Sequence, residues 1–211
     1  EIDLFALGIT NLSLFPVAYH GVPPGPEVYF NHQRLILARW PNEGWATVAR
    51  IIEPGSRPRD GDQRGLTGEF EYAGDRPARW QAGEGVWLQG YWCYDWYDEV
   101  IRVAAIDQGT RRIRLAAPHL YSLMQGNPSP RRYRALNVLE ELDQPGEYVI
   151  DRQAGRLYLW PAAGLAGAEV LLSTLDKPVV ALENASHIVW RGFVIESGMD
   201  QSCARSPPAA A

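Results

Sequence analysis

The stretch VWLQGYWCYDWYDEVIRVAAIDQGTRRIRLA, residues 86–116, decides the fold class. Three runs within it are rich in Val, Ile, Leu and aromatic residues: 86–92, 100–106 and 112–116. Short β-branched and aromatic runs bounded by Gly, Asn, Asp or Pro are typical of β-strands. The last two runs flank Asp107-Gln108-Gly109-Thr110, so we expect them to pair as a β-hairpin.

The same pattern of short apolar and aromatic runs bounded by turn residues continues along the 211-residue chain. Further strands are expected at 27–30, 34–38, 45–52, 148–151 and 156–160. The first two form a hairpin around Asn31-His32, because Asn accepts a positive φ more readily than most residues. Residues 53–68 predict a solvated loop. The best short helix is 136–142, ended by Pro145-Gly146.

Composition supports a globular, mainly β protein. The 20 Gly and 16 Pro, 36 of 211 residues, are too many for a helical bundle and too few for a low-complexity chain. The formal net charge of −5 argues against a nucleic-acid partner, which needs a basic face. No apolar stretch approaches the ~18 residues of a membrane span.

Cysteine and histidine usage predicts neither a disulfide framework nor a metal site. Cys93 lies in an aromatic run and is expected to be a buried hydrophobe, whereas Cys203 lies in a Ser/Pro/Ala tail. The four histidines have no cysteine partner at ligand spacing, and no Gly-rich phosphate loop follows a strand. We therefore expect no metal and no cofactor.

The segment after residue 165 changes character. Residues 170–175, 179–182 and 187–195 are apolar on both faces, and short polar corners separate them. Such strands are typical of parallel sheets, and tight corners between them suit a parallel β-helix. We expect an antiparallel β barrel or sandwich over 1–165, the first coil of a right-handed parallel β-helix over 166–197, and an irregular tail over 198–211.

Several segments in order carry a family resemblance. They are LILARWPNEG at 35–44, GDRPARW at 74–80, GYW at 90–92 with Asp95-Trp96, LEELD at 139–143 and LYLWP at 157–161. The chain up to about residue 197 resembles the N-terminal region of bacterial right-handed parallel β-helix proteins of the pectin-lyase-like group, many of which are glycoside hydrolases.

The resemblance implies a carbohydrate-related function. It implies an accessory domain that caps the β-helix of a secreted or periplasmic polysaccharide-degrading enzyme, with a polysaccharide or oligosaccharide as its ligand. The family's catalytic carboxylates lie beyond residue 197. An isolated solenoid start leaves a strand edge exposed, which predicts a homodimer through that edge.

Six aromatic residues between positions 87 and 97 form the densest feature of the sequence. Aromatic rings pack against the C–H faces of sugars, so Trp92, Tyr94, Trp96 and Tyr97 are candidate substrate-binding residues. Alternate rings in strands also build cores, and that interpretation stays open. We expect Trp92 and Trp96 to pack inward and Tyr94 and Tyr97 to be exposed.

Two motifs supply the polar candidates. Asp95 and Asp98 could form the carboxylate pair of a glycosidase, with Glu43 as a further candidate, although Asp residues in a turn more often cap local N–H groups. In the corner Arg39–Gly44, Arg39 and Asn42 are candidate substrate ligands, and Arg39 could pair with Glu43. Three functions therefore stay open: an accessory domain, a glycosidase active in itself, and a stand-alone carbohydrate-binding module.

Overall fold

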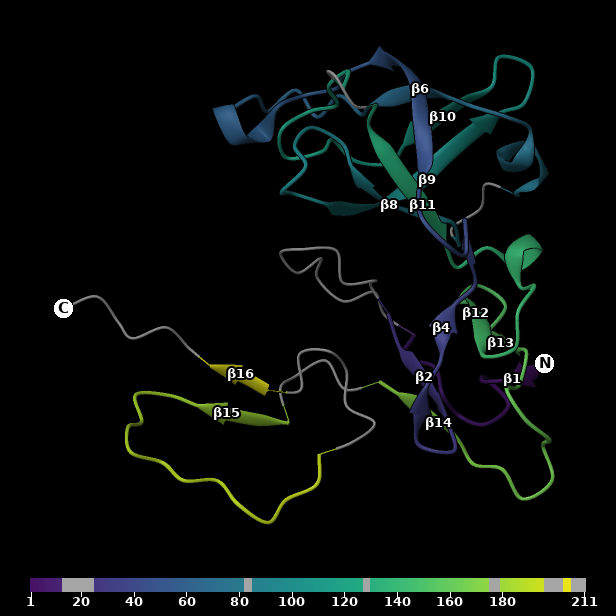
Figure 1. The fold of residues 1–211 in the computed structure, drawn as a ribbon, viewed down its shortest axis with the longest axis vertical. Helices are drawn as coiled ribbons and strands as arrows, with labels where there is room; N and C mark the ends of the chain where they lie inside the picture. Colours follow the sequence, from purple (N-terminus) through teal and green to yellow (C-terminus); the bar gives the residue numbers. More distant parts are fainter. Residues whose placement is uncertain (13–24, 82–84, 127–129, 175–178, 196–202, 206–211) are drawn as a thin grey trace.

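The computed structural model describes residues 1–12, 25–81, 85–126, 130–174, 179–195 and 203–205. The protein is mainly β, as expected, and the helices of this described part are three single 3-10 turns. These turns are η1 (Pro58–Asp60), η2 (Arg76–Arg79) and η3 (Leu139–Glu141). Figure 1 shows two β units stacked along the long axis, with the barrel at the top of the view.

The upper unit is a closed antiparallel barrel of six strands. In barrel order these are β6 (Ala46–Glu53), β7 (Glu69–Tyr72), β10 (Arg112–Leu115), β9 (Glu99–Asp107), β8 (Trp87–Tyr91) and β11 (Arg132–Leu136). β11 closes the barrel because it pairs with β8 on one side and with β6 on the other. The short β5 (Arg39–Trp40) continues the β6 side along β11. Closure leaves no free sheet edge around the barrel.

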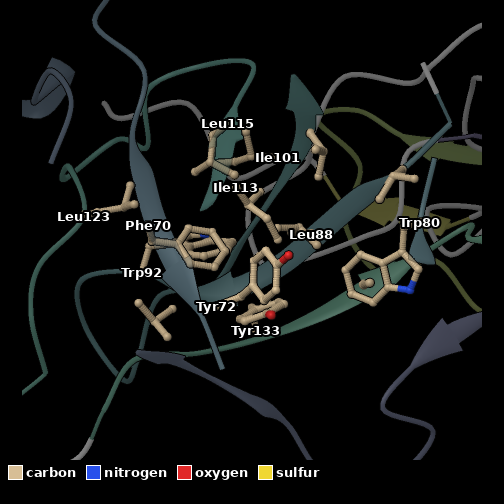
Figure 2. Close-up of a cluster of buried hydrophobic side chains, with 14 of the residues drawn as sticks. Phe70, Tyr72, Trp80, Leu88, Trp92, Ile101, Ile113, Leu115, Leu123 and Tyr133 are labelled. Atoms are coloured by element: carbon tan, nitrogen blue, oxygen red, sulfur yellow. The ribbon is translucent and has the colours of Figure 1, made fainter. Parts of the chain in front are cut away.

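Aromatic side chains fill the barrel interior. Phe70 on β7 lies 5.6 Å from Trp92 and 5.2 Å from Tyr133, measured between ring centroids, and Figure 2 shows these rings together. Strand alternation explains the inward positions: Phe70 and Tyr72 point inward, whereas Glu69 and Glu71 point outward and pair with Arg112 and Arg50. The core is therefore built by the two-residue period of the strands.

A glycine makes room for the largest core ring. A Cβ built on Gly90 would lie 2.4 Å from Cε2 of Trp92, so the strand backbone approaches the indole too closely for any side chain. Cys93 is buried, as expected. These contacts confirm that Trp92 is a core residue.

The lower unit packs two small sheets. One contains β1 (Ile2–Asp3), β13 (Arg156–Leu159), β12 (Glu147–Asp151) and β4 (Ile36–Leu37), the last pairing parallel to β12. The other contains β14 (Val170–Ser173), β2 (Glu27–Phe30) and β3 (Gln33–Arg34). Their shared core includes Leu4, Val28, Phe30, Leu35, Tyr148, Ile150 and Leu157.

Buried polar side chains join the two units. Asn137, just after β11, has a positive φ of 58°, donates from Nδ2 to the carbonyls of Gly85 and Ile150, and accepts the Ile150 N–H at 2.8 Å. The buried carboxylate of Glu141 accepts hydrogen bonds from Arg76 and from Trp80 Nε1. Such fully bonded buried groups fix one relative arrangement of their elements.

Three of the five motifs that carry the family resemblance meet at this junction. Trp40 and Asn42 come from the first motif, Arg76 and Trp80 from the second, and Glu141 and Asp143 from the fourth. The Trp40 and Trp80 rings lie 5.6 Å apart, and Asn42 Nδ2 donates to Asp143 at 2.8 Å. These motif residues hold the junction together by their own contacts.

The expected hairpins are confirmed. β2 and β3 pair around Asn31 and His32, whose φ values are 49° and 64°, β9 pairs with β10, and β12 pairs with β13. The helix expected at 136–142 is wrong: residue 136 ends β11, and only one 3-10 turn follows. The positive φ at Asn137 explains this result, because it cannot belong to a right-handed helix.

The expected β-helix start is not observed. β14, the first strand of that expected coil, instead pairs antiparallel with β2, because its apolar residues complete the lower core beside Phe30. β15 (Val180–Leu182) does pair parallel, with β16 (Cys203–Arg205). Residues 183–195 form no strand, and their apolar side chains are exposed. The described residues thus contain no parallel β-helix coil.

We predict that Asn137→Ala destabilises the protein by about 3 kcal/mol, because three buried hydrogen bonds are lost and a Cβ residue without a compensating side chain keeps a left-handed backbone. Asn137→Gly loses the same hydrogen bonds without the backbone strain, so it should be about 1 kcal/mol less destabilised. Urea unfolding measures both. Equal unfolding midpoints for the two variants would contradict the strain argument. If both variants unfolded at the same urea concentration as the wild-type protein, the hydrogen-bond argument would be wrong.

Candidate functional site

An aromatic platform stands at the loop between β8 and β9. We define it by Tyr94, Trp96, Tyr97 and Tyr121. The rings of Tyr94 and Trp96 stack, with centroids 5.1 Å apart and planes inclined by 11°. Tyr121 meets both edge-on, at 5.3 and 5.7 Å. Trp96 is 57% exposed, so a large apolar ring faces solvent while its neighbours hold it in place.

A polar pair, the buried His119 and the half-buried Glu99, adjoins this platform through Tyr97. The ring of Tyr97 lies 5.5 Å from that of His119, which is fully buried. His119 Nε2 lies 3.3 Å from Glu99 Oε2, and this carboxylate also accepts the Leu120 N–H. His119 Nδ1 lies 2.9 Å from the Ser122 carbonyl oxygen and 3.3 Å from the Tyr121 backbone nitrogen. The pair therefore anchors the 119–122 loop that carries Tyr121.

Burial shifts both groups of this pair toward their neutral forms. It raises the pKa of Glu99 and lowers that of His119 from 6.5 to about 4. The charged forms are disfavoured because little solvent reaches either group. Glu99 is thus a carboxyl group of raised pKa beside an exposed aromatic surface.

The structure reverses two exposure expectations. Trp96 was expected to pack inward and is exposed, whereas Tyr97 was expected to be exposed and is 7% exposed. The β8–β9 connection is a loop, so the strand alternation that assigned these positions does not apply there. Tyr94 is half-buried, and its hydroxyl accepts a hydrogen bond from Arg57.

The two aspartates of this loop have different surroundings. Asp95 is exposed, accepts from Arg132 at 2.5 Å and lies 3.6 Å from Arg131. The Arg132 hydrogen bond lowers the pKa of Asp95. Asp98 is buried and accepts from Gln89 at 2.7 Å. Asp95 therefore pins the loop to the start of β11, and Asp98 pins it to β8.

The corner candidates lie elsewhere. Arg39 pairs in register with Leu136, at the opposite end of β11 from Arg132. Asn42 bonds Asp143, Glu43 is exposed, and no ion pair joins Arg39 to Glu43 in the parts of the chain that the structure describes. Arg39 instead lines a cavity between the two units. The structure thus separates Arg39, Asn42 and Glu43 from the aromatic platform.

Sequence reasoning missed Glu99, His119 and Tyr121 as members of the site. The aromatic run at 87–97 was visible, but Tyr121 lies more than twenty residues later in a segment with no repeated pattern. No group of three or more His, Cys, Asp or Glu side chains suitable for a metal ion occurs among the described residues. Within the same residues, no helix is long and apolar enough to cross a membrane.

Comparison with known proteins supports the fold. No protein-family model matches the chain, and no curated protein matches it. A solved structure named "Glycoside hydrolase" is similar, with a TM-score of 0.51 and 14% sequence identity over 80% of this chain. The chain spans 28% of that protein's length. At this identity the likeness shows a shared fold, that of one part of a glycoside hydrolase.

We predict that His119 makes stability fall with acid. Its pKa is lowered, so its contribution is complete above pH 6.5 and is lost as the pH falls toward 4. The difference between these pKa values corresponds to about 3 kcal/mol of unfolding free energy. His119→Gln should therefore flatten the stability profile between pH 6.5 and 4, measured by urea unfolding at each pH.

Glu99→Gln is the control for this profile. The raised pKa of Glu99 gives stability that is present at low pH and is lost as the pH rises, which opposes the His119 effect. Removing this carboxyl group should make the acid loss steeper. A His119→Gln profile with the wild-type slope would contradict the account of the pair.

Proposed function

We propose that the chain is a carbohydrate-binding accessory domain of a bacterial polysaccharide-degrading glycoside hydrolase of the β-helix type. The aromatic platform carries this proposal: an exposed indole is stacked on Tyr94 and braced by Tyr121. Likeness to part of a solved glycoside hydrolase supports the fold on which the platform stands. The resemblance of the motifs supports the enzyme type.

The platform suits a sugar for two physical reasons. The C–H groups on one face of a pyranose pack against an aromatic ring, and the ring's neighbours already hold Trp96 in a fixed orientation. A surface that is rigid before binding has less conformational entropy to lose when the ligand arrives. The Arg57 hydrogen bond to Tyr94 and the Asp95–Arg132 pair add polar groups around the platform.

A capping role belongs to the same proposal. After β15, residues 187–195 expose a run of large apolar side chains: Ile188, Val189, Trp190, Phe193, Val194 and Ile195. A run of this kind is typical of a surface that another part of a protein covers. Successive coils of a β-helix, continuing the parallel pairing of β15 and β16, would cover it. A second copy of the chain at this edge is the alternative occupant.

A second candidate function is hydrolysis by this chain itself. Glycosidases need one carboxyl group as the acid and one carboxylate as the base or nucleophile. Glu99, with its raised pKa, has the property of the acid, and Asp95, ionised beside Arg132, has that of the second group. Asp98 and Glu43 are the remaining carboxylates to test.

The accessory proposal predicts that Trp96→Ala abolishes most polysaccharide binding, weakening it at least about tenfold, because anchoring aromatics dominate interface energies. Affinity electrophoresis on a panel of polysaccharide gels measures the retardation. Trp160→Ala is the matched control, since Trp160 is also exposed but belongs to the lower unit. Wild-type retardation of the Trp96 variant, or no retardation on any gel, would overturn the proposal.

Activity on aryl glycosides separates the two candidates. An accessory domain should show no turnover in the wild type, and Asp95→Asn, Asp98→Asn and Glu99→Gln should then change polysaccharide retardation only through the loops that these carboxylates hold. Turnover that is lost in Glu99→Gln and in Asp95→Asn or Asp98→Asn, while the variants stay folded, would instead establish the chain as a glycosidase.

A further inference from the structure

A cavity of about 260 Å³ lies between the barrel and the lower unit. β5, β8 and β11 of the barrel form one side, and β2, β3, β4 and β12 form the other. Typical small-molecule sites have roughly 300–1,000 Å³, so this cavity has room for a single small group. Its apolar walls include Leu35, Ile36, Leu136 and Ile150.

The charges around this cavity are unbalanced. Four arginines line it, from both units: Arg34, Arg39, Arg134 and Arg152. Glu27 is the one acidic residue among the lining side chains, and it already pairs with Arg34 and accepts the Tyr29 hydroxyl. The whole chain has a net charge of −5, so a general basic character does not explain this cluster.

Arg39 and Arg134 have guanidinium N–H groups that bond no acceptor among the described residues. No hydrogen bond or ion pair engages Arg39 among the described residues, although it is half-buried. Arg134 donates from Nη2 to the Gly44 carbonyl and lies over the Trp45 ring at 4.8 Å, but its buried Nε bonds nothing in the described part of the chain. Buried donors without an acceptor cost free energy, which a bound acceptor would recover.

The pKa values of the cavity arginines also indicate a partly desolvated group of cations. Burial lowers the pKa of Arg134, and the neighbouring Arg39 lowers it further, while Glu43 opposes the shift. Burial also lowers the pKa of Arg152. The carboxylate of Glu147 interacts electrostatically with Arg39 from an adjacent cavity, but backbone N–H groups of Asp143 and Gln144 occupy it. A partly desolvated group of cations favours an anion in its midst.

We propose that this cavity binds one oxyanion, a carboxylate or a sulfate, carried by a sugar residue. The planar guanidinium fork of an arginine matches both groups through paired, charge-assisted hydrogen bonds. The apolar walls would receive the ring's C–H face, and Gln89, whose Nε2 donates to Asp98, lines the barrel side. The saccharide part of this assignment rests on the proposed function, whereas the oxyanion part rests on the cavity alone.

The bound anion would also link the two units. Arg39 and Arg134 belong to the barrel strands β5 and β11, whereas Arg34 and Arg152 belong to the lower unit. A ligand held from both sides stabilises the arrangement in which both sides meet. A charged saccharide bound in the cavity would thus stabilise the relative arrangement of the barrel and the lower unit.

Isothermal titration calorimetry of the full chain tests the proposal with four probes: glucuronate, glucose 6-sulfate, glucose and inorganic sulfate. Glucuronate or glucose 6-sulfate should bind measurably, more tightly than inorganic sulfate, and glucose should not bind. Arg39→Gln should weaken the charged sugar at least about tenfold, the loss expected for one charge-assisted bond. Its melting temperature should not fall, because no hydrogen bond or ion pair engages Arg39 among the residues that the structure describes.

Two further variants sharpen the result. Arg134→Gln should weaken binding similarly, and Arg50→Gln is the control, since Arg50 lies exposed on the barrel and pairs with Glu71. Equal affinity for glucose and its charged derivatives, or unchanged affinity in Arg39→Gln, would overturn the proposal. Inorganic sulfate binding as tightly as the sugars would overturn the saccharide assignment.

The outcome separates this cavity from the proposed function. Trp96→Ala should keep glucuronate or glucose 6-sulfate binding, because Trp96 does not line the cavity. Charged-sugar binding without polysaccharide retardation would refute the platform and support the cavity. Retardation that depends on Trp96, without any effect of Arg39→Gln on charged sugars, would refute the cavity and support the platform.

Discussion

The pairing of β11 on both of its sides is the constraint on which the rest of this structure depends. Its N-terminal half lies between β6 and β8, and its C-terminal half lies between β5 and β8. Tyr133 and Ala135 point into the barrel core, and the alternate residues Arg132 and Arg134 point out. One five-residue strand thereby closes the barrel and presents two cations to its surface.

Arg132 and Arg134 make contacts near opposite ends of the barrel. Arg132 bonds Asp95 and so holds the loop that carries Trp96. Arg134 lines the cavity at the junction with the lower unit, and Asn137 follows immediately to bond the β12 backbone. The aromatic platform and the arginine cavity are therefore both positioned by the register of β11, although they lie near opposite ends of it.

This central strand was not predicted from the sequence, and the reason is physical. Residues 131–134 read RRYR, and clustered charge is typical of a solvated segment rather than of a strand that closes a barrel. Tyr133 and Ala135 point to one side only because pairing with β6 and β8 makes this segment a strand. By contrast, the β2–β3 and β9–β10 hairpins follow from local turn chemistry, so they could be predicted. The fold class and these hairpins were accessible, whereas the barrel's closure was not.

The site shows the same division. The aromatic run around Trp92 and Trp96 was evident, yet which ring faces solvent depends on where β8 ends and the loop begins. Tyr121 and His119 join the platform through contacts with residues more than twenty positions away, which no local pattern encodes. The cavity arginines come from four separate segments, and they become a cluster only when the two units meet.

Backbone amide chemical shifts of the ¹⁵N-labelled chain, titrated with fragments of whichever polysaccharide retards it, test the central claim most directly. A saccharide on the aromatic platform predicts that the largest changes occur at residues 94–97 and 119–122, with smaller changes through the start of β11. Changes confined to residues 187–195, or an unchanged spectrum at saturating saccharide, would contradict the claim.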